Sequence, residues 1–240
     1  QSFTRNRFTT SAYILLGFYA FIQSALGPIM PFVRADLSLN YTITGLHLTG
    51  FALGMVIAGL SSAPIAHRFG RKRLYWGGGL GMCIGSGLFM LAQVAPLTIL
   101  GTFMMGWLGT YLLVMIQSTL ADEHLSNRAI AFTESNIVAS IFAVFAPIMV
   151  GLGVSMGLTW RFSLVLGIGL WVLLVLFYHQ ATLPKSKSTT DTISQKESLP
   201  RLFWFYWFVV FLSVAMEWCM IFWSADFLEK VVLLPTQQAA

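Results

Sequence analysis

The side chains of this chain that could do chemistry are a few polar residues inside long apolar stretches. Glu217 stands out, because a helix that enters a bilayer at Leu202 reaches position 217 after roughly 22 Å of a roughly 30 Å core. An ionised carboxylate at that depth costs about 2 to 3.5 kcal/mol, so we expect Glu217 to exchange protons near neutral pH. Ser213 and Ser224 lie on nearly the same helical face. The sequence therefore predicts a site for a proton or a substrate cation, and the alternative is a protonated Glu that only hydrogen-bonds a neighbouring helix.

Other polar side chains lie in separate apolar stretches. Tyr19 and Gln23 are one helical turn apart. Thr110 and Gln117 are about two turns apart, and Asn136 lies in a further stretch. Polar groups within a membrane tend to face a cavity or a partner, so these residues are candidates for contacting a substrate. For Gln23 and Asn136 the competing interpretation is an interhelical hydrogen bond worth about 0.5 to 2 kcal/mol.

Seven long apolar stretches must position these side chains. Hydrophobic residues make up 57% of the 240 residues and charged residues 10%, and the mean hydropathy is +0.75. A soluble core of this size cannot hide so many apolar residues, so the sequence predicts an all-α, polytopic membrane protein in a lipid bilayer. About 20 apolar residues suffice for one helical crossing. The predicted spans are 11–32, 46–66, 74–94, 97–118, 129–154, 162–178 and 202–223.

The cations are distributed unequally between the two ends of these spans. If the N-terminus lies inside, all but three of the 14 Lys and Arg residues fall on the cytoplasmic side, the exceptions being Arg34, Arg161 and Lys230. We therefore expect a multi-pass protein of the plasma membrane with a cytoplasmic N-terminus. Cations in short loops between spans predict no nucleic-acid partner. Cys83 and Cys219 both lie in apolar stretches, so neither a disulfide nor a metal site is expected.

A basic elbow, residues 67–73, separates the second and third spans. One interpretation is a cytoplasmic loop whose cations only fix the orientation. A nucleic-acid patch is disfavoured, because two membrane spans hold the elbow at the bilayer surface. The third interpretation is a family motif: residues 63–72 resemble the pattern G-x-L-A-D-R-x-G-R-[KR] of the major facilitator superfamily of secondary transporters. Ala63 stands where the motif has its first glycine, and His67 where it has its aspartate.

This resemblance implies a fold and an activity. In that family six helices, arranged as 3+3 inverted repeats, form one half, and a cytoplasmic linker joins it to six more. Residues 1–182 then correspond to the N-terminal six-helix half, 183–201 to the linker, and 202–240 to the first helix of a C-terminal half whose remainder is missing. The implied activity is secondary transport of a small solute, coupled to protons, without a cofactor and without an enzymatic reaction. The first, fourth and seventh helices would line the path, and the gating residues would be Arg68, Gly70, Arg71, Lys72 and Asp122.

Particular contacts are expected from these positions. Asp122, at the inner end of the fourth span, is expected to pair with Arg71, and Glu134 with the basic elbow. His47 is expected to reach the outer membrane interface. Small residues at i+4 steps predict close helix packing in lipid: Gly50, Gly54, Ala58 and Ser62 in the second span, Gly77, Gly81 and Gly85 in the third, and Ala139, Ala143, Pro147 and Gly151 in the fifth.

A seven-helix receptor or sensor without transport is the alternative function. No lysine lies within a predicted span to hold a retinal Schiff base, and an inward N-terminus is the wrong orientation for such receptors. An enzyme is disfavoured, because the sequence contains neither His-Glu-x-x-His nor Gly-x-Ser-Gly.

Overall fold

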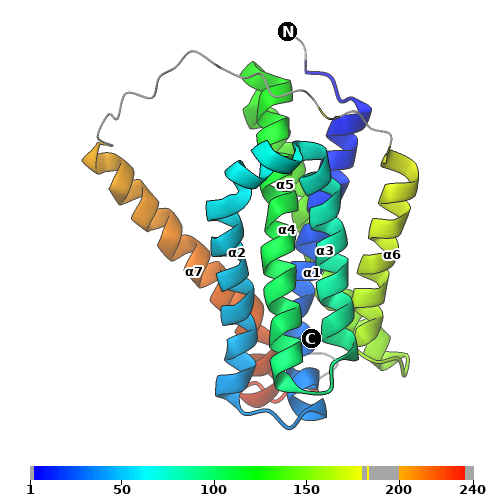
Figure 1. Cartoon of the computed structure of the whole chain (residues 1–240). Helices are drawn as coiled ribbons and strands as arrows, with labels where there is room; N and C mark the ends of the chain where they lie inside the picture. Colours follow the sequence, from blue (N-terminus) through cyan, green and yellow to red (C-terminus); the bar gives the residue numbers. More distant parts are fainter. Residues whose placement is uncertain (1–2, 180–182, 184–199, 236–240) are drawn as a thin grey trace.

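The computed structural model describes residues 3–179, 183 and 200–235, and this part of the chain is helical with no strand (Figure 1). Six helical stretches within it are long and apolar enough to cross a membrane, with residues 95–155 counted as one stretch. The prediction of an all-α polytopic membrane protein is therefore confirmed. The linker expected at 183–201 lies largely outside the described residues. The helices are α1 (Arg7–Asp36), α2 (Tyr41–Phe69), α3 (Arg71–Leu91), α4 (Ala95–His124), the short 3-10 helix η1 (Leu125–Asn127), α5 (Arg128–Ser155), α6 (Arg161–Tyr178) and α7 (Arg201–Lys230).

Helices α1 and α2 begin before the apolar stretches from which their spans were predicted, because asparagine side chains cap their starts. The side chain of Asn6 accepts a hydrogen bond from the backbone N–H of Thr9, 2.8 Å away, at the start of α1. Asn40 caps α2 in the same way through the N–H of Ile43. An N-cap side chain satisfies a backbone donor that has no partner within the helix.

Tight turns return the chain at the end of the bundle where α1 begins, which we call the inner end, the opposite end being the outer end. Gly70 joins α2 to α3 with φ +85°, a conformation that glycine adopts without steric cost. Leu125, also at positive φ, begins the turn between α4 and α5. The expected hairpin at the basic elbow forms, but α2 and α3 touch each other little, and both pack along α4.

The helix contacts are those expected of two three-helix repeats, in which each contact between the repeats has an equivalent with the two repeats interchanged. If α1, α2 and α3 correspond to α4, α5 and α6, the packing of α1 on α5 corresponds to that of α4 on α2. The packing of α6 on α1 corresponds in turn to that of α3 on α4, and both pairs of contacts are present. Helix α1 lies at the centre of the bundle, with most of its side chains buried.

Small residues permit the closest helix approaches. A Cβ at Gly54 of α2 would lie 2.5 Å from the backbone oxygen of Phe103 in α4, and one at Gly106 would collide with the backbone of Phe51. The predicted ridge of α2 is confirmed, since its four residues are all buried. In α3 the predicted ridge is wrong at one position, because Gly77 faces open space and Gly78 packs against α4 in its place. The predicted ridge of α5 is only partly buried, and the fully buried small residues of that helix are instead Ala131, Ser135, Ala146 and Gly153.

Helix α7 leaves the bundle at a steep angle (Figure 1). It contacts α1 near its outer end, where a Cβ at Gly27 would collide with the carbonyl oxygen of Ile221. The ring centroid of Trp218 in α7 also lies 5.5 Å from that of Phe51 in α2, with the two ring planes tilted by 47°. Side chains 201–217 of α7 are exposed, so α7 is attached by its outer half alone.

Candidate functional site

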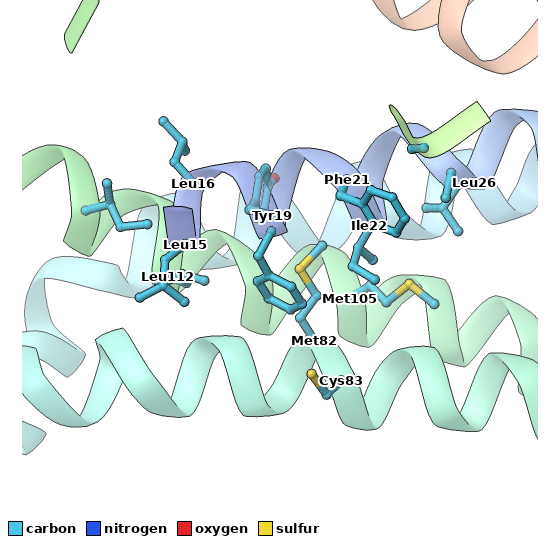
Figure 2. Close-up of a cluster of buried hydrophobic side chains, with 14 of the residues drawn as sticks. Leu15, Leu16, Tyr19, Phe21, Ile22, Leu26, Met82, Cys83, Met105 and Leu112 are labelled. Carbon is cyan, nitrogen blue, oxygen red and sulfur yellow. The ribbon is translucent and has the colours of Figure 1, made fainter. Parts of the chain in front are cut away.

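Two buried hydroxyl groups face each other between α1 and α4. Tyr19 lies on α1 within a cluster of buried side chains from α1, α3 and α4 (Figure 2). Its ring lies against Gly109, whose Cβ would be 3.2 Å from it, and its hydroxyl lies close to that of Thr110. The two hydroxyls interact weakly with each other, but neither makes a hydrogen bond of good geometry with any described residue. An unsatisfied buried hydroxyl costs about 1 to 3 kcal/mol, so this pair is a position where a polar ligand group would be stabilised.

The remaining predicted polar residues lie in different surroundings. Gln23 is half-buried on α1, one turn from Tyr19 toward the outer end, and Gln117 is exposed on α4. Asn136 is exposed as well, and its amide donates a hydrogen bond to the backbone oxygen of Phe132, 2.9 Å away in its own helix. The recorded hydrogen bond of Asn136 is therefore neither interhelical nor part of the Tyr19 cluster.

Glu217 lies at about the depth of Gln23. Helices α1 and α7 run in the same direction and touch at Gly27 and Ile221 (Figure 1). Gln23 and Glu217 each precede that contact by one turn, which is roughly 6 Å toward the inner end. The carboxyl side chain is exposed on the part of α7 that diverges from the bundle.

The basic elbow forms the ion pair that its sequence predicts. Arg71 Nη1 lies 2.5 Å from Asp122 Oδ2 at the inner end of α4, with both side chains about one quarter exposed. The guanidinium of Arg68 lies 5.4 Å from the ring centroid of Phe69. Lys72 borders a cavity between α2, α3 and α4. Among the ion pairs of the described residues, the Arg71–Asp122 pair alone joins the elbow to α4.

The expectation that Glu134 pairs with the basic elbow is wrong. Its carboxylate accepts hydrogen bonds from Arg5 at 2.9 and 2.5 Å, and from the Tyr13 hydroxyl at 3.3 Å. The reason is packing: α1 lies along α5, which brings the segment before α1 beside the start of α5. The hydrogen bond from Arg5 to Glu134, together with the negative charge of Glu134, raises the pKa of Arg5 above its ordinary value. Nearby, Asn6 donates to Glu123 at 2.7 Å, so the N-terminal segment is fixed to the inner ends of α4 and α5.

Charged residues also join helices at the outer end. Arg34 of α1 and Asp226 of α7 lie 2.5 Å apart without hydrogen-bond alignment, and each side chain is about 15% exposed. The indole N–H of Trp160 donates to Asp36 at 2.9 Å. Arg161, which follows it at the start of α6, donates to the backbone oxygen of Met90 in α3. The outer end is therefore held by contacts among α1, α3, α6 and α7.

Sequence reasoning missed two polar clusters between α2 and α4. The Tyr111 hydroxyl lies 2.7 Å from the Ser61 hydroxyl and accepts a hydrogen bond from the Trp107 indole at 2.9 Å. The i+4 spacing of Trp107 and Tyr111 was a signal that could have revealed this cluster. The expectation for His47 is wrong, since it is fully buried and its ring lies 2.8 Å from the Thr98 hydroxyl.

The described residues contain no metal cluster, and the chain matches a family of known proteins. Within the part of the chain that the structure describes, no three His, Cys, Asp or Glu side chains gather as ligands for a metal. Among curated proteins no relative matches the chain. The family model described as Major Facilitator Superfamily matches residues 12–237.

Proposed function

The chain belongs to the major facilitator superfamily of membrane transporters, and from this premise we propose that it works as a proton-coupled carrier of a small solute. The proposed substrate position is between α1 and α4, at Tyr19 and Thr110. Glu217 is proposed to bind the coupled proton. The proposed location is the plasma membrane, with the N-terminus in the cytoplasm.

The observation that carries this proposal is the pair of unsatisfied hydroxyls. Tyr19 and Thr110 are both almost fully buried, and neither makes a hydrogen bond of good geometry with any described residue. A protein normally satisfies such groups, and one left without a partner deserves a functional explanation. A solute with a donor and an acceptor would satisfy both hydroxyls at once. Gln23, one turn along α1, would extend the same polar surface toward Glu217.

The arrangement of α7 supports alternating access. Transport in this family requires one group of helices to rock against another around a central site. Helix α7 meets α1 at its outer half through Gly27 and Ile221, while its inner half is exposed. The close contact between Gly27 and Ile221 fits a state closed at the outer end. Separation of Arg34 from Asp226 would accompany opening at the outer end.

Replacement of one hydroxyl tests the substrate position. Tyr19→Phe removes the hydroxyl and keeps the ring, so the KM for transport should rise about threefold to tenfold, the equivalent of one neutral hydrogen bond. Because the hydroxyl makes no hydrogen bond of good geometry with any described residue, the free energy of unfolding should change by less than about 0.5 kcal/mol. Transport is measured with the full-length protein in sealed liposomes, and unfolding in detergent.

A matched tyrosine in α4 is the control. Tyr111→Phe removes a hydroxyl that contacts Ser61 and Trp107, so it should lower the free energy of unfolding by about 0.5 to 1.5 kcal/mol and leave KM unchanged. A stability loss without a KM change in Tyr19→Phe would show that its hydroxyl is structural and would refute the proposed substrate position.

A further inference from the structure

A cavity of about 600 Å³ lies at the inner surface of the bundle beside the basic elbow. Its walls come from the last turns of α2, the first residues of α3, the inner end of α4 and Leu183. His67, Arg71 and Lys72 border it at the elbow, whereas Val114 and Met115 of α4 form part of an apolar wall. The cavity therefore combines positive charge at the membrane surface with an apolar wall inside the bilayer.

The protein neutralises only part of this positive charge. Arg71 is paired with Asp122. For His67 and Lys72, by contrast, no ion pair is recorded within the described residues. His67 also stands where the family motif has an aspartate, so the acid that would repel an anion at this position is replaced by a basic side chain. The cavity is therefore complementary to a negatively charged group.

We infer that this cavity binds an anionic phospholipid, with the phosphate at Arg71 and Lys72 and the first methylenes against Val114 and Met115. Basic pockets between membrane helices on the cytoplasmic side bind anionic headgroups. Ser62 lines the cavity about 7 Å deeper than His67 along α2, so the cavity extends from headgroup depth into the acyl region. A free phosphate ion would leave the apolar wall uncovered, which favours a lipid. The inference rests on the proposed orientation, because anionic lipids are enriched in the cytoplasmic leaflet.

Native mass spectrometry of the full-length protein tests this site. The purified protein is titrated with phosphatidylglycerol or with phosphatidylcholine of the same acyl chains, and the bound lipid is counted. Wild type should bind phosphatidylglycerol more tightly. Lys72→Gln should weaken that binding about fivefold, the effect expected of one cation near an anionic headgroup. Arg73→Gln is the matched control, since Arg73 belongs to the same elbow but does not border the cavity.

Further variants separate charge from folding. Lys72→Arg should retain the affinity for phosphatidylglycerol, and His67→Asp should lower it at least as much as Lys72→Gln. Equal weakening in Lys72→Gln and Arg73→Gln would overturn the inference, because it would indicate general surface charge. Equal affinity for both lipids, or displacement of phosphatidylglycerol by inorganic phosphate, would overturn it as well. Lipid binding is measured without transport, so its failure is distinguishable from a failure of the proposed function.

Discussion

At the scale of single residues, the pair Arg71 and Asp122 is the contact that connects the basic elbow to the bundle. Both side chains are about one quarter exposed, and an ion pair of that exposure contributes about 0 to 1 kcal/mol to stability. Its position at the inner surface, far from Tyr19, makes it suited to control the rate of conformational exchange. The pair would then have to separate or re-form as the helices move.

Arg71→Ala should therefore slow transport severalfold while equilibrium binding of the substrate stays nearly intact. Arg73→Ala is the control, because Arg73 shares the elbow and has no recorded ion pair among the described residues. Substrate binding to the purified protein and initial uptake rates in liposomes are the two measurements. A large loss of equilibrium binding in Arg71→Ala would count against a gating role.

The sequence could predict a contact between two residues where their depth in the membrane alone decides which side chains meet. Asp122 and Arg71 were paired correctly, because both lie at the same end of the bundle. The partner of Glu134 was wrong, because the inner surface offers several cations and the packing of α1 on α5 selects Arg5. Helix periodicity placed Tyr19 and Thr110 on separate helices and could not show that their hydroxyls meet.

At the scale of helices, apolar length predicted the seven long helices of the described residues, whereas side-chain capping set the starts of α1 and α2. Asn6 begins α1 before its apolar stretch, and charged residues such as Lys230 continue α7 beyond it. In α3, consecutive glycines left two possible ridges, and the sequence favoured Gly77 where packing uses Gly78. The tilt of α7 was not predictable, because it depends on a close contact between Gly27 and Ile221 that periodicity does not reveal.

Two glycines of α2 provide a test of helix packing. Gly54→Ala places a Cβ 2.5 Å from the backbone of Phe103 and Trp107, so it should lower the free energy of unfolding by about 1 to 3 kcal/mol. Gly59→Ala meets nothing within 4 Å and should leave stability unchanged or raise it by up to about 1 kcal/mol. Unfolding of both variants in detergent is the measurement. Equal effects of the two substitutions would contradict the packing of α2 on α4.

At the scale of the whole molecule, the distribution of the cations supports the proposed orientation, and the helix ends offer matched positions to test it. Ser38 lies at the outer end and Ser126 at the inner end, and both are exposed. In a background without Cys83 and Cys219, Ser38→Cys should react with a membrane-impermeant maleimide from outside intact cells. Ser126→Cys should react only after the membrane is opened. Reaction of both from outside would exclude the proposed orientation.

Glu217 is the residue proposed to bind the coupled proton. It is an exposed carboxylate at about the depth of Gln23, on the helix that the proposed mechanism moves relative to the bundle. Glu217→Gln keeps the shape of the side chain and removes its titration. The matched control is Glu123→Gln, which removes an exposed carboxylate at the inner end of α4.

Proton-driven accumulation in sealed liposomes tests the central claim most directly. The full-length protein is screened under an imposed pH gradient against drugs, sugars and organic acids, with solute exchange at equal pH measured in parallel. The account predicts saturable accumulation by wild type and Glu123→Gln that a protonophore abolishes. It predicts for Glu217→Gln a loss of accumulation with exchange preserved. Ligand binding without any flux in wild type would indicate a sensor, and unchanged proton-driven accumulation in Glu217→Gln would place the coupling site elsewhere.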